Sequence, residues 1–190
     1  MGLLDKLLGR SRPVPPDLDQ LFAVPSAAIT LATTTDYTPT GVGSVCFRAA
    51  EGAAFASLQR EIRTLLDADQ GPPVEVTQDS YGFTWIVARH DPGEVAELVT
   101  DLHAVNTTLA DQGFGPQLLC SLVAFAEPAG RALGLVYLYK RGTFYPFAPV
   151  GDQRRDNAVE LQVRGALVND LRIEPDVTRW FPVWGAPGLG

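Results

Sequence analysis

Two long apolar runs joined by five residues constrain the fold of this chain more than any other feature. The runs are LLCSLVAFA (residues 118–126) and ALGLVYLYK (132–140), and EPAGR separates them. Pro128 and Gly130 in this connection are residue types that favour tight turns. Because both runs are almost continuously apolar, they indicate two central strands of a sheet that is covered on at least one face.

Other strand patterns surround this pair. Tyr81, Phe83, Trp85 and Val87 alternate along the sequence, which predicts a second hairpin made of VEVTQ and YGFTWIVAR across DSYG. A further strand is expected in GSVCFRA (43–49), after a turn or loop at 35–43. The stretch FYPFAPV (144–150) is expected to be irregular and aromatic.

Amphipathic spacing predicts the helices. The expected segments are residues 17–34 in two pieces around Pro25, 53–68, 93–111 and 154–170, the last with apolar residues on two sides. Strands and helices are segregated, without the regular alternation typical of a parallel sheet. The sequence therefore predicts an α+β fold, with an antiparallel sheet of about five or more strands packed by helices.

The two halves of the chain resemble each other weakly. Residues 30–47 and 107–125 both run from a helix end through an aromatic residue and a proline into a strand that contains a cysteine. This echo fits two similar halves, although turn chemistry alone also produces such a pattern.

The first 16 residues are set apart from the rest. At about 100° per residue, Leu3, Leu4, Leu7 and Leu8 form one stripe of a short amphipathic helix over residues 3–10. The sequence SRPVPP (11–16) then cannot continue the helix, so we expect an arm and linker at 1–16 and a single α+β domain at 17–190. A helix this short is marginal alone in water, so it must dock on its own domain, on a partner or on a bilayer. The linker favours a target outside the domain.

Composition narrows the function classes. The chain has 190 residues, 46% of them hydrophobic, and a net charge of −7. The hydrophobic content excludes bulk disorder, and the acidic charge argues against nonspecific nucleic-acid binding. The leading apolar stretch is too short for a secretory signal, and no window reaches the length of a membrane span. We therefore expect a cytoplasmic protein.

No motif for catalysis or metal binding stands out. His90 and His103 lack metal-ligand spacing, and Cys46 and Cys120 lie in apolar runs where a free cysteine behaves as a small hydrophobe. The prediction is a protein without catalytic residues, metal or other cofactor.

Two groups of side chains remain as candidate contacts. One is a set of cations in loops with aromatic residues between them: Lys140, Arg141, Arg154 and Arg155, with Phe144, Tyr145 and Phe147. If the loops converge, this patch could hold an anion, a small ligand or an acidic segment of a partner, which gives an alternative function as a ligand-binding or enzymatic domain. The other group is Trp180 and Trp184 in the tail, which either fill a groove of their own domain or contact a partner.

Long stretches of the chain resemble the PspA-associated PspAB family of high-GC Gram-positive bacteria. The matching words begin with GLLDKLLGRSRPVPPDLDQLFAVPSAA and continue through TPTGVGSVCFRAAEGAAF, VTDLHAVNTTLADQGFGPQLLCSLVAF, VYLYKRGTFYPFAP, RRDNAVELQVRGAL and RWFPVWGAPGL. The resemblance implies an accessory role around PspA, the coiled-coil membrane-remodelling protein of the phage-shock response to envelope stress. It transfers no catalytic residues.

Together these observations predict a non-enzymatic interaction protein of the PspA system. The expected partner is a PspA-like coiled-coil protein or another component of that system. Contact with the inner face of the cell membrane through Leu3, Leu4, Leu7 and Leu8 is part of the same hypothesis.

Overall fold

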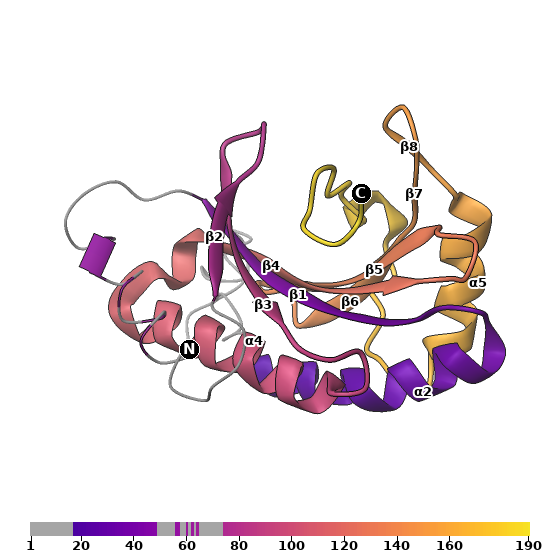
Figure 1. Ribbon diagram of the computed structural model, residues 1–190, viewed down its shortest axis with the longest axis horizontal. Helices are drawn as coiled ribbons and strands as arrows, with labels where there is room; N and C mark the ends of the chain where they lie inside the picture. The colour runs from indigo at the N-terminus through magenta and orange to yellow at the C-terminus, as the bar shows by residue number, and fades with distance from the viewer. Residues whose placement is uncertain (1–16, 49–55, 58–59, 61, 63, 65–73) are drawn as a thin grey trace, which may run out of the picture.

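A six-stranded antiparallel sheet forms the centre of the protein (Figure 1). The computed structural model describes residues 17–48, 56, 57, 60, 62, 64 and 74–190, so the predicted arm at 3–10 and most of the predicted helix at 53–68 lie outside the described residues. In spatial order the strands are β2 (Glu75–Gln78), β3 (Phe83–Arg89), β1 (Thr38–Arg48), β4 (Leu118–Ala126), β5 (Ala132–Leu138) and β6 (Thr143–Phe147). The predicted α+β architecture is confirmed.

Helices and short strands complete the described fold. The main helices are α2 (Val24–Thr34), α4 (Val95–Leu109) and α5 (Asn157–Leu167). Short helical turns are η1 (Leu18–Ala23), η3 (Ala110–Phe114), η4 (Gly115–Gln117) and η5 (Val177–Arg179). Strands β7 (Pro149–Val150) and β8 (Arg154–Arg155) form a separate small hairpin.

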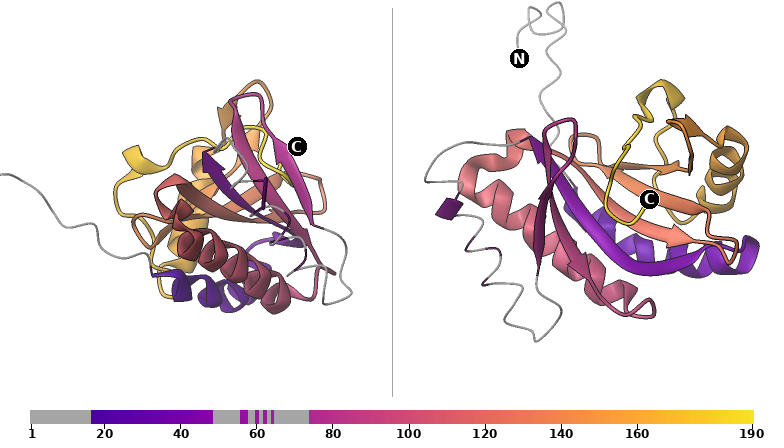
Figure 2. Two further views of the ribbon diagram at one scale, coloured as in Figure 1. Left: turned by 90° about the vertical axis from the view of Figure 1, so that its left-hand side faces the viewer. Right: turned by 45° about the horizontal axis from the view of Figure 1, so that its top comes forward.

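The sheet has a different cover on each face. Helices α2 and α4 lie against one face, and the C-terminal tail crosses the other, as both views in Figure 2 show. Alternate strand residues therefore enter two cores: Phe47, Phe125 and Leu135 pack on the helix side, whereas Leu122 and Val136 pack toward the tail. This explains why β4 and β5 are apolar at almost every position.

The echo between the two halves falls on comparable elements. Helix α2 leads into β1 and helix α4 leads into β4, and these two strands pair at the centre of the sheet. Cys46 lies directly opposite Cys120 in their register. The next strands are connected differently in the two halves. In the first half, β1 pairs with β3 and not with β2, the next strand in sequence; in the second half, β4 pairs with β5, which follows it directly.

Strand β1 begins five residues earlier than the sequence predicted, at Thr38 instead of Gly43. The expected loop is extended because it pairs with the end of β4, with a register shift between Pro39 and Gly43. Gly41 makes this shift possible: its φ is +77°, and a Cβ there would lie 2.0 Å from the carbonyl oxygen of His90.

The region from 143 to 170 also differs from the prediction. Residues expected to be irregular form strand β6, and Arg154 and Arg155, expected in a helix, form β8. Helix α5 begins only at Asn157, where the Asp156 carboxylate accepts a hydrogen bond from the Val159 amide. The helix is buried on one side only, because Leu161 and Val168 are exposed.

Candidate functional site

The tail side of the sheet contains an apolar cavity of about 670 Å³, which we call the sheet groove. Its floor includes Cys46, Cys120 and Leu138 from the three strands β1, β4 and β5. One wall is the β2–β3 hairpin and the opposite wall is the tail at residues 181–184. The volume lies within the range usual for small-molecule and anchor-residue pockets.

The β2–β3 hairpin holds its wall in place through Asp79. One carboxylate oxygen of Asp79 accepts hydrogen bonds from the amides of Tyr81 and Phe83, both at 2.9 Å. The other accepts one from the indole N–H of Trp85, also at 2.9 Å. The turn therefore presents the three predicted aromatic side chains, Tyr81, Phe83 and Trp85, to the groove, and Tyr81 at its rim is 51% exposed.

The tail wall is fixed by aromatic contacts on the sheet. The Trp180 ring is buried and stacks on Tyr145 with 6.2 Å between ring centroids, and Trp184 meets the edge of Phe147 at 4.9 Å. The Tyr145 hydroxyl donates a 2.7 Å hydrogen bond to the Phe181 carbonyl. This leaves the Phe181 ring 59% exposed at the rim, across the groove from Tyr81.

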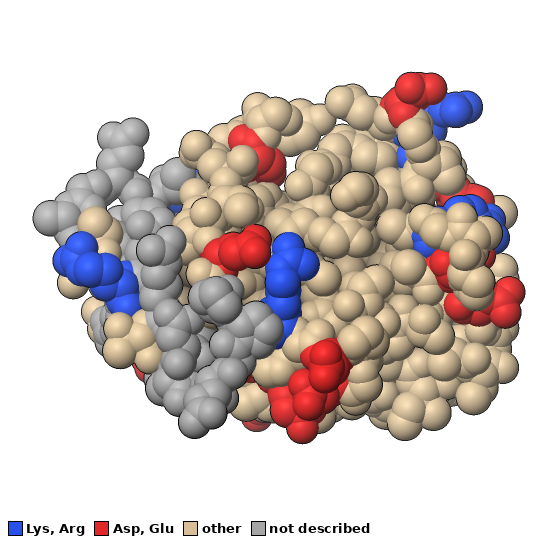
Figure 3. Space-filling model, viewed as in Figure 1, with Lys and Arg blue, Asp and Glu red and all other residues tan. Residues whose placement is uncertain are grey.

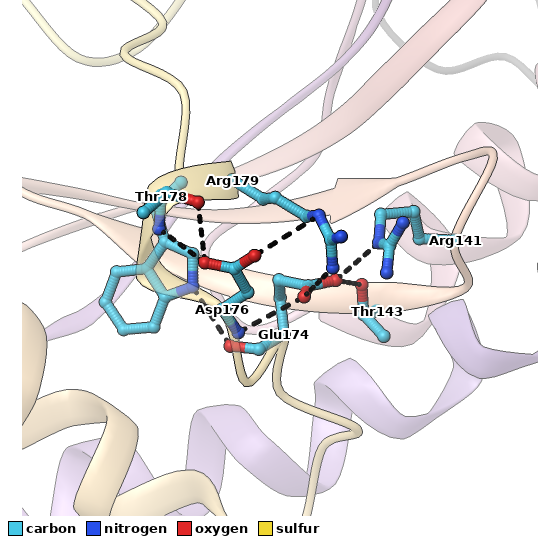
Figure 4. A network of polar contacts seen from close by, with 7 residues as sticks. Arg141, Thr143, Glu174, Asp176, Thr178 and Arg179 are labelled. Carbon is cyan, nitrogen blue, oxygen red and sulfur yellow. Dashed lines mark hydrogen bonds and ion pairs between the residues drawn. The ribbon is translucent and has the colours of Figure 1, made fainter.

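A buried carboxylate ties the tail to the β5–β6 turn (Figure 4). Glu174 is fully buried and accepts hydrogen bonds from Arg141 at 2.7 Å and Thr143 at 2.9 Å. It also accepts from the Asp176 amide at 3.2 Å and pairs with Arg179 at 3.4 Å. Burial alone would raise the pKa of Glu174, but the bonds from Arg141 and Thr143 outweigh it and lower the pKa.

The two hairpin tips beside the groove are joined by a hydrogen bond. The Gln153 side-chain amide in the β7–β8 turn donates to the Tyr81 hydroxyl at 3.1 Å. In Figure 3, uncharged atoms cover most of the upper surface between the two hairpins, and charged side chains lie mainly toward its ends. The groove thus has apolar walls and a polar bridge at its outer edge.

The four predicted cations occupy two separate places. Lys140 and Arg141 line the groove at the start of β6, whereas Arg154 and Arg155 lie beyond the end of that strand. Arg155 pairs with Glu160 at 2.8 Å and lies 5.0 Å over the Phe147 ring, and exposed Arg154 is 3.9 Å from Asp152. The structure does not bring these cations into one patch.

The predicted aromatic contacts divide in the same way. Phe144, Tyr145 and Phe147 are each at most 1% exposed, because the segment is a strand whose alternate side chains enter the two cores. Tyr145 nevertheless lines the groove, and so does Trp184. Burial, followed by the nearby Cys120 thiol, raises the pKa of Tyr145 well above its usual value, so its hydroxyl remains a hydrogen-bond donor.

Two thiols, Cys46 and Cys120, form part of the groove floor. Both cysteines are free and buried. A hydrogen bond with Cys120 and then burial raise the pKa of Cys46 far above its usual value. Because the thiolate is the reactive form, Cys46 is poorly suited to nucleophilic chemistry and acts as an apolar floor group, with the buried Cys120 directly opposite it on β4.

No group of three or more histidine, cysteine, aspartate or glutamate side chains that could hold a metal occurs among the described residues. His90 lies 2.7 Å from Asp101 on α4, and His103 lies 3.4 Å from Asp19 and packs on Phe22. These histidines are paired with carboxylates away from the groove lining. Within the same part of the chain, no helix is both long and apolar enough to span a bilayer.

Sequence patterns identified one wall of the groove but not the groove itself. The alternation from Tyr81 to Trp85 marks the hairpin wall correctly. Arg48 and Phe181 line the groove at its mouth and rim, and no sequence pattern predicted a contact for either side chain. Phe181 lies between Trp180 and Trp184, which is a sequence signal for an aromatic contact. Its place at the groove could not be predicted, because contacts distant in sequence decide which face of the sheet the tail crosses.

Comparison with known proteins identifies one family. The family model described as PspA associated protein B, PspAB, matches residues 1–188, almost the whole chain. Searches of curated proteins and of solved structures return no match. The family description indicates association with PspA and is consistent with an accessory role. The chain therefore belongs to the PspAB family of PspA-associated proteins.

Proposed function

We propose that this protein is a non-enzymatic accessory protein of the PspA system that binds an amphipathic helix of PspA, or of another component, in the sheet groove. The observation that carries the proposal is the apolar groove with a half-exposed aromatic ring on each rim, Tyr81 and Phe181. Coiled-coil proteins consist of helices with an apolar stripe, and such helices bind hydrophobic grooves through residues spaced by three or four positions.

Charge at the groove mouth suggests which helix would fit. Arg48 and Lys140 are exposed there, and neither forms an ion pair with another described residue. Arg141 is already paired with Glu174, and Asp79 is hydrogen-bonded within its turn. A helix with acidic residues beside its apolar stripe would match these two exposed cations, although the whole protein is acidic.

Binding of purified PspA to rim variants tests the proposal. The double variant Tyr81→Ala/Phe181→Ala removes both exposed rings, and we expect it to weaken binding at least tenfold, because aromatic anchors dominate interface energies. The matched control is Ile29→Ala/Leu161→Ala, which removes exposed apolar side chains on α2 and α5. The control should bind within about twofold of the wild type. Equal affinity of the rim variant and the wild type would refute the groove as the binding site.

The same groove could instead take a small apolar ligand, which corresponds to the alternative of a ligand-binding domain. Native mass spectrometry of the protein purified from its own cells distinguishes the two occupants. A bound small molecule that resists displacement by PspA would contradict the proposed helix site. An empty groove that becomes occupied by PspA supports it.

Membrane contact through Leu3, Leu4, Leu7 and Leu8 belongs to the same proposal and rests on the amphipathic pattern of the arm. Flotation with liposomes containing anionic lipid tests it in the presence of PspA. The variant Leu4→Asp/Leu7→Asp should float less than the wild type, because two charges would enter the apolar stripe. Unchanged flotation would remove membrane contact from the proposed function.

A further inference from the structure

We propose that the sheet groove is also the docking site of the protein's own N-terminal arm, residues 3–10, and that a partner helix binds by displacing this arm. Docking of the arm does not require the function proposed above, whereas displacement rests on it. The proposal names one occupant for the sheet groove. Three observations support docking of the arm, and a fourth supports its displacement.

The first observation is where the described chain begins. The Asp17 carbonyl accepts a 2.7 Å hydrogen bond from the Tyr137 hydroxyl at the end of β5. The Asp17 Cβ lies 3.7 Å from the position of a Cβ built on Gly142. Lys140 and Arg141, which line the groove, lie between these two contacts in sequence. The described chain therefore begins beside the turn that forms one end of the groove.

The second observation is the length of the linker. Residues 11–16 contain three prolines and favour extended backbone. At about 3.1 Å per residue, these six residues span roughly 19 Å. Asp17 is anchored on the helix side of the sheet, because Tyr137 belongs to that core. The linker needs only to pass around the short β5–β6 turn to bring the arm to the groove on the other side.

The third observation is the match between apolar surfaces. In a helix over residues 3–10, four leucines would lie on one side, and Asp5, Lys6 and Arg10 on the other. The groove offers apolar walls and a thiol floor, and its two rim aromatics are half exposed. A docked arm would cover both apolar surfaces and leave its charged side in water. This provides the docking that such a short helix needs for order.

The fourth observation is that the charges do not match well. The arm carries two basic residues and one acidic residue, and the exposed side chains at the groove mouth, Arg48 and Lys140, are also basic. Tethering compensates for this, because a short linker holds the arm at a high effective concentration. A partner helix with an acidic flank would have the better charge match. The arm is thus suited to fill the groove and then to be displaced, which frees its leucine stripe for another surface.

Site-specific photo-cross-linking in the full chain tests the docking. Benzoylphenylalanine replaces Leu7 on the apolar side of the arm, and in the control it replaces Lys6 on the charged side. Both positions lie outside the described domain, so neither change alters its core. After irradiation at low micromolar concentration, mass spectrometry identifies the cross-linked peptides.

We expect position 7 to cross-link within the same molecule to residues 79–85 or 181–184, at least fivefold more than position 6. Adducts confined to the helix side, adducts only between molecules, or equal yields from both positions would overturn the docking. Addition of PspA should then abolish the groove adduct. If the adduct forms and PspA leaves it unchanged, docking stands and displacement is wrong. If PspA binds through the rim aromatics but no groove adduct forms, the proposed function stands and the arm inference is wrong.

Discussion

Glu174 contacts three parts of the chain at once: the β5–β6 turn through Arg141, strand β6 through Thr143, and the tail through the Asp176 amide and Arg179. A fully buried carboxylate is costly unless its oxygens are paired, and here all these groups donate to it. Because the tail forms one groove wall, this side chain helps to hold that wall, together with the aromatic contacts of Trp180 and Trp184. No local sequence pattern around residue 174 indicates that role.

Replacement of this carboxylate tests its contribution to stability. We expect Glu174→Gln to lower the free energy of unfolding at pH 7 by about 2 kcal/mol. This is less than the ~3–5 kcal/mol typical of a fully buried ion pair, because both guanidinium groups are partly in water. The control is Glu97→Gln on the exposed side of α4, which should change stability by less than about 0.5 kcal/mol. Urea denaturation measures both. A loss no larger than that of the control would show that Glu174 does not stabilise the tail.

The difference in unfolding free energy between the wild type and Glu174→Gln depends on pH in a defined direction. The pKa of Glu174 is lower in the folded protein than its unfolded value of 4.5, so the folded state favours the charged form. Its stabilisation is complete above pH 4.5 and decreases as the pH falls through the folded pKa. The stability gap between wild type and Glu174→Gln should therefore shrink in acid. A gap that stays constant from pH 7 to pH 3 would contradict this assignment.

At the scale of elements, sequence patterns succeeded where local chemistry decides and failed where distant contacts decide. The β4–β5 pair and the β2–β3 hairpin were predicted because apolar runs and turn residues lie next to each other in sequence. The first part of β1 was missed because its threonine, proline and glycine pair with the end of β4, which is distant in sequence. Strand β6 follows β5 across a short turn, but Pro146 disguises its strand pattern, and Phe144 also exchanges hydrogen bonds with the distant residues Arg172 and Glu174. The groove draws its walls and floor from five strands and the tail, so no single segment predicts it.

Replacement of Gly41 tests whether the irregular part of β1 requires the backbone conformation of this one residue. A Cβ at residue 41 would lie 2.0 Å from the His90 carbonyl oxygen, and the φ of +77° disfavours any side chain. We expect Gly41→Ala to destabilise the fold by about 2 kcal/mol or more. The control is Gly165→Ala in α5, where a Cβ meets nothing within 4 Å and helix propensity predicts a gain of about 0.5–1 kcal/mol. Thermal unfolding measures both variants. Melting temperatures that shift in the same direction would contradict this prediction.

At the scale of the whole molecule, the two faces of the sheet differ in how firmly they are covered. The helix side is closed by α2 and α4, whereas among the described residues the other side is covered mainly by the tail. Trp180 is the chief contact of that tail: it stacks on Tyr145, and its indole N–H donates to the Glu174 carbonyl at 3.0 Å. The tail can therefore detach locally and expose the groove side of the sheet to a partner while the core on the helix side stays folded.

Removal of the Trp180 ring should separate the stabilities of these two faces. We expect Trp180→Ala to cost about 3 kcal/mol or more and to expose the groove floor, because the ring is buried and no neighbour replaces it. Hydrogen exchange should then accelerate in residues 174–190 and in β6, while the amides of α4 remain protected, and binding of an apolar dye should rise. The exposed Leu161→Ala on α5 serves as the control and should show neither effect. If α4 loses protection together with the tail, the two cores unfold as one unit, and a partner could not reach the groove by loosening the tail alone.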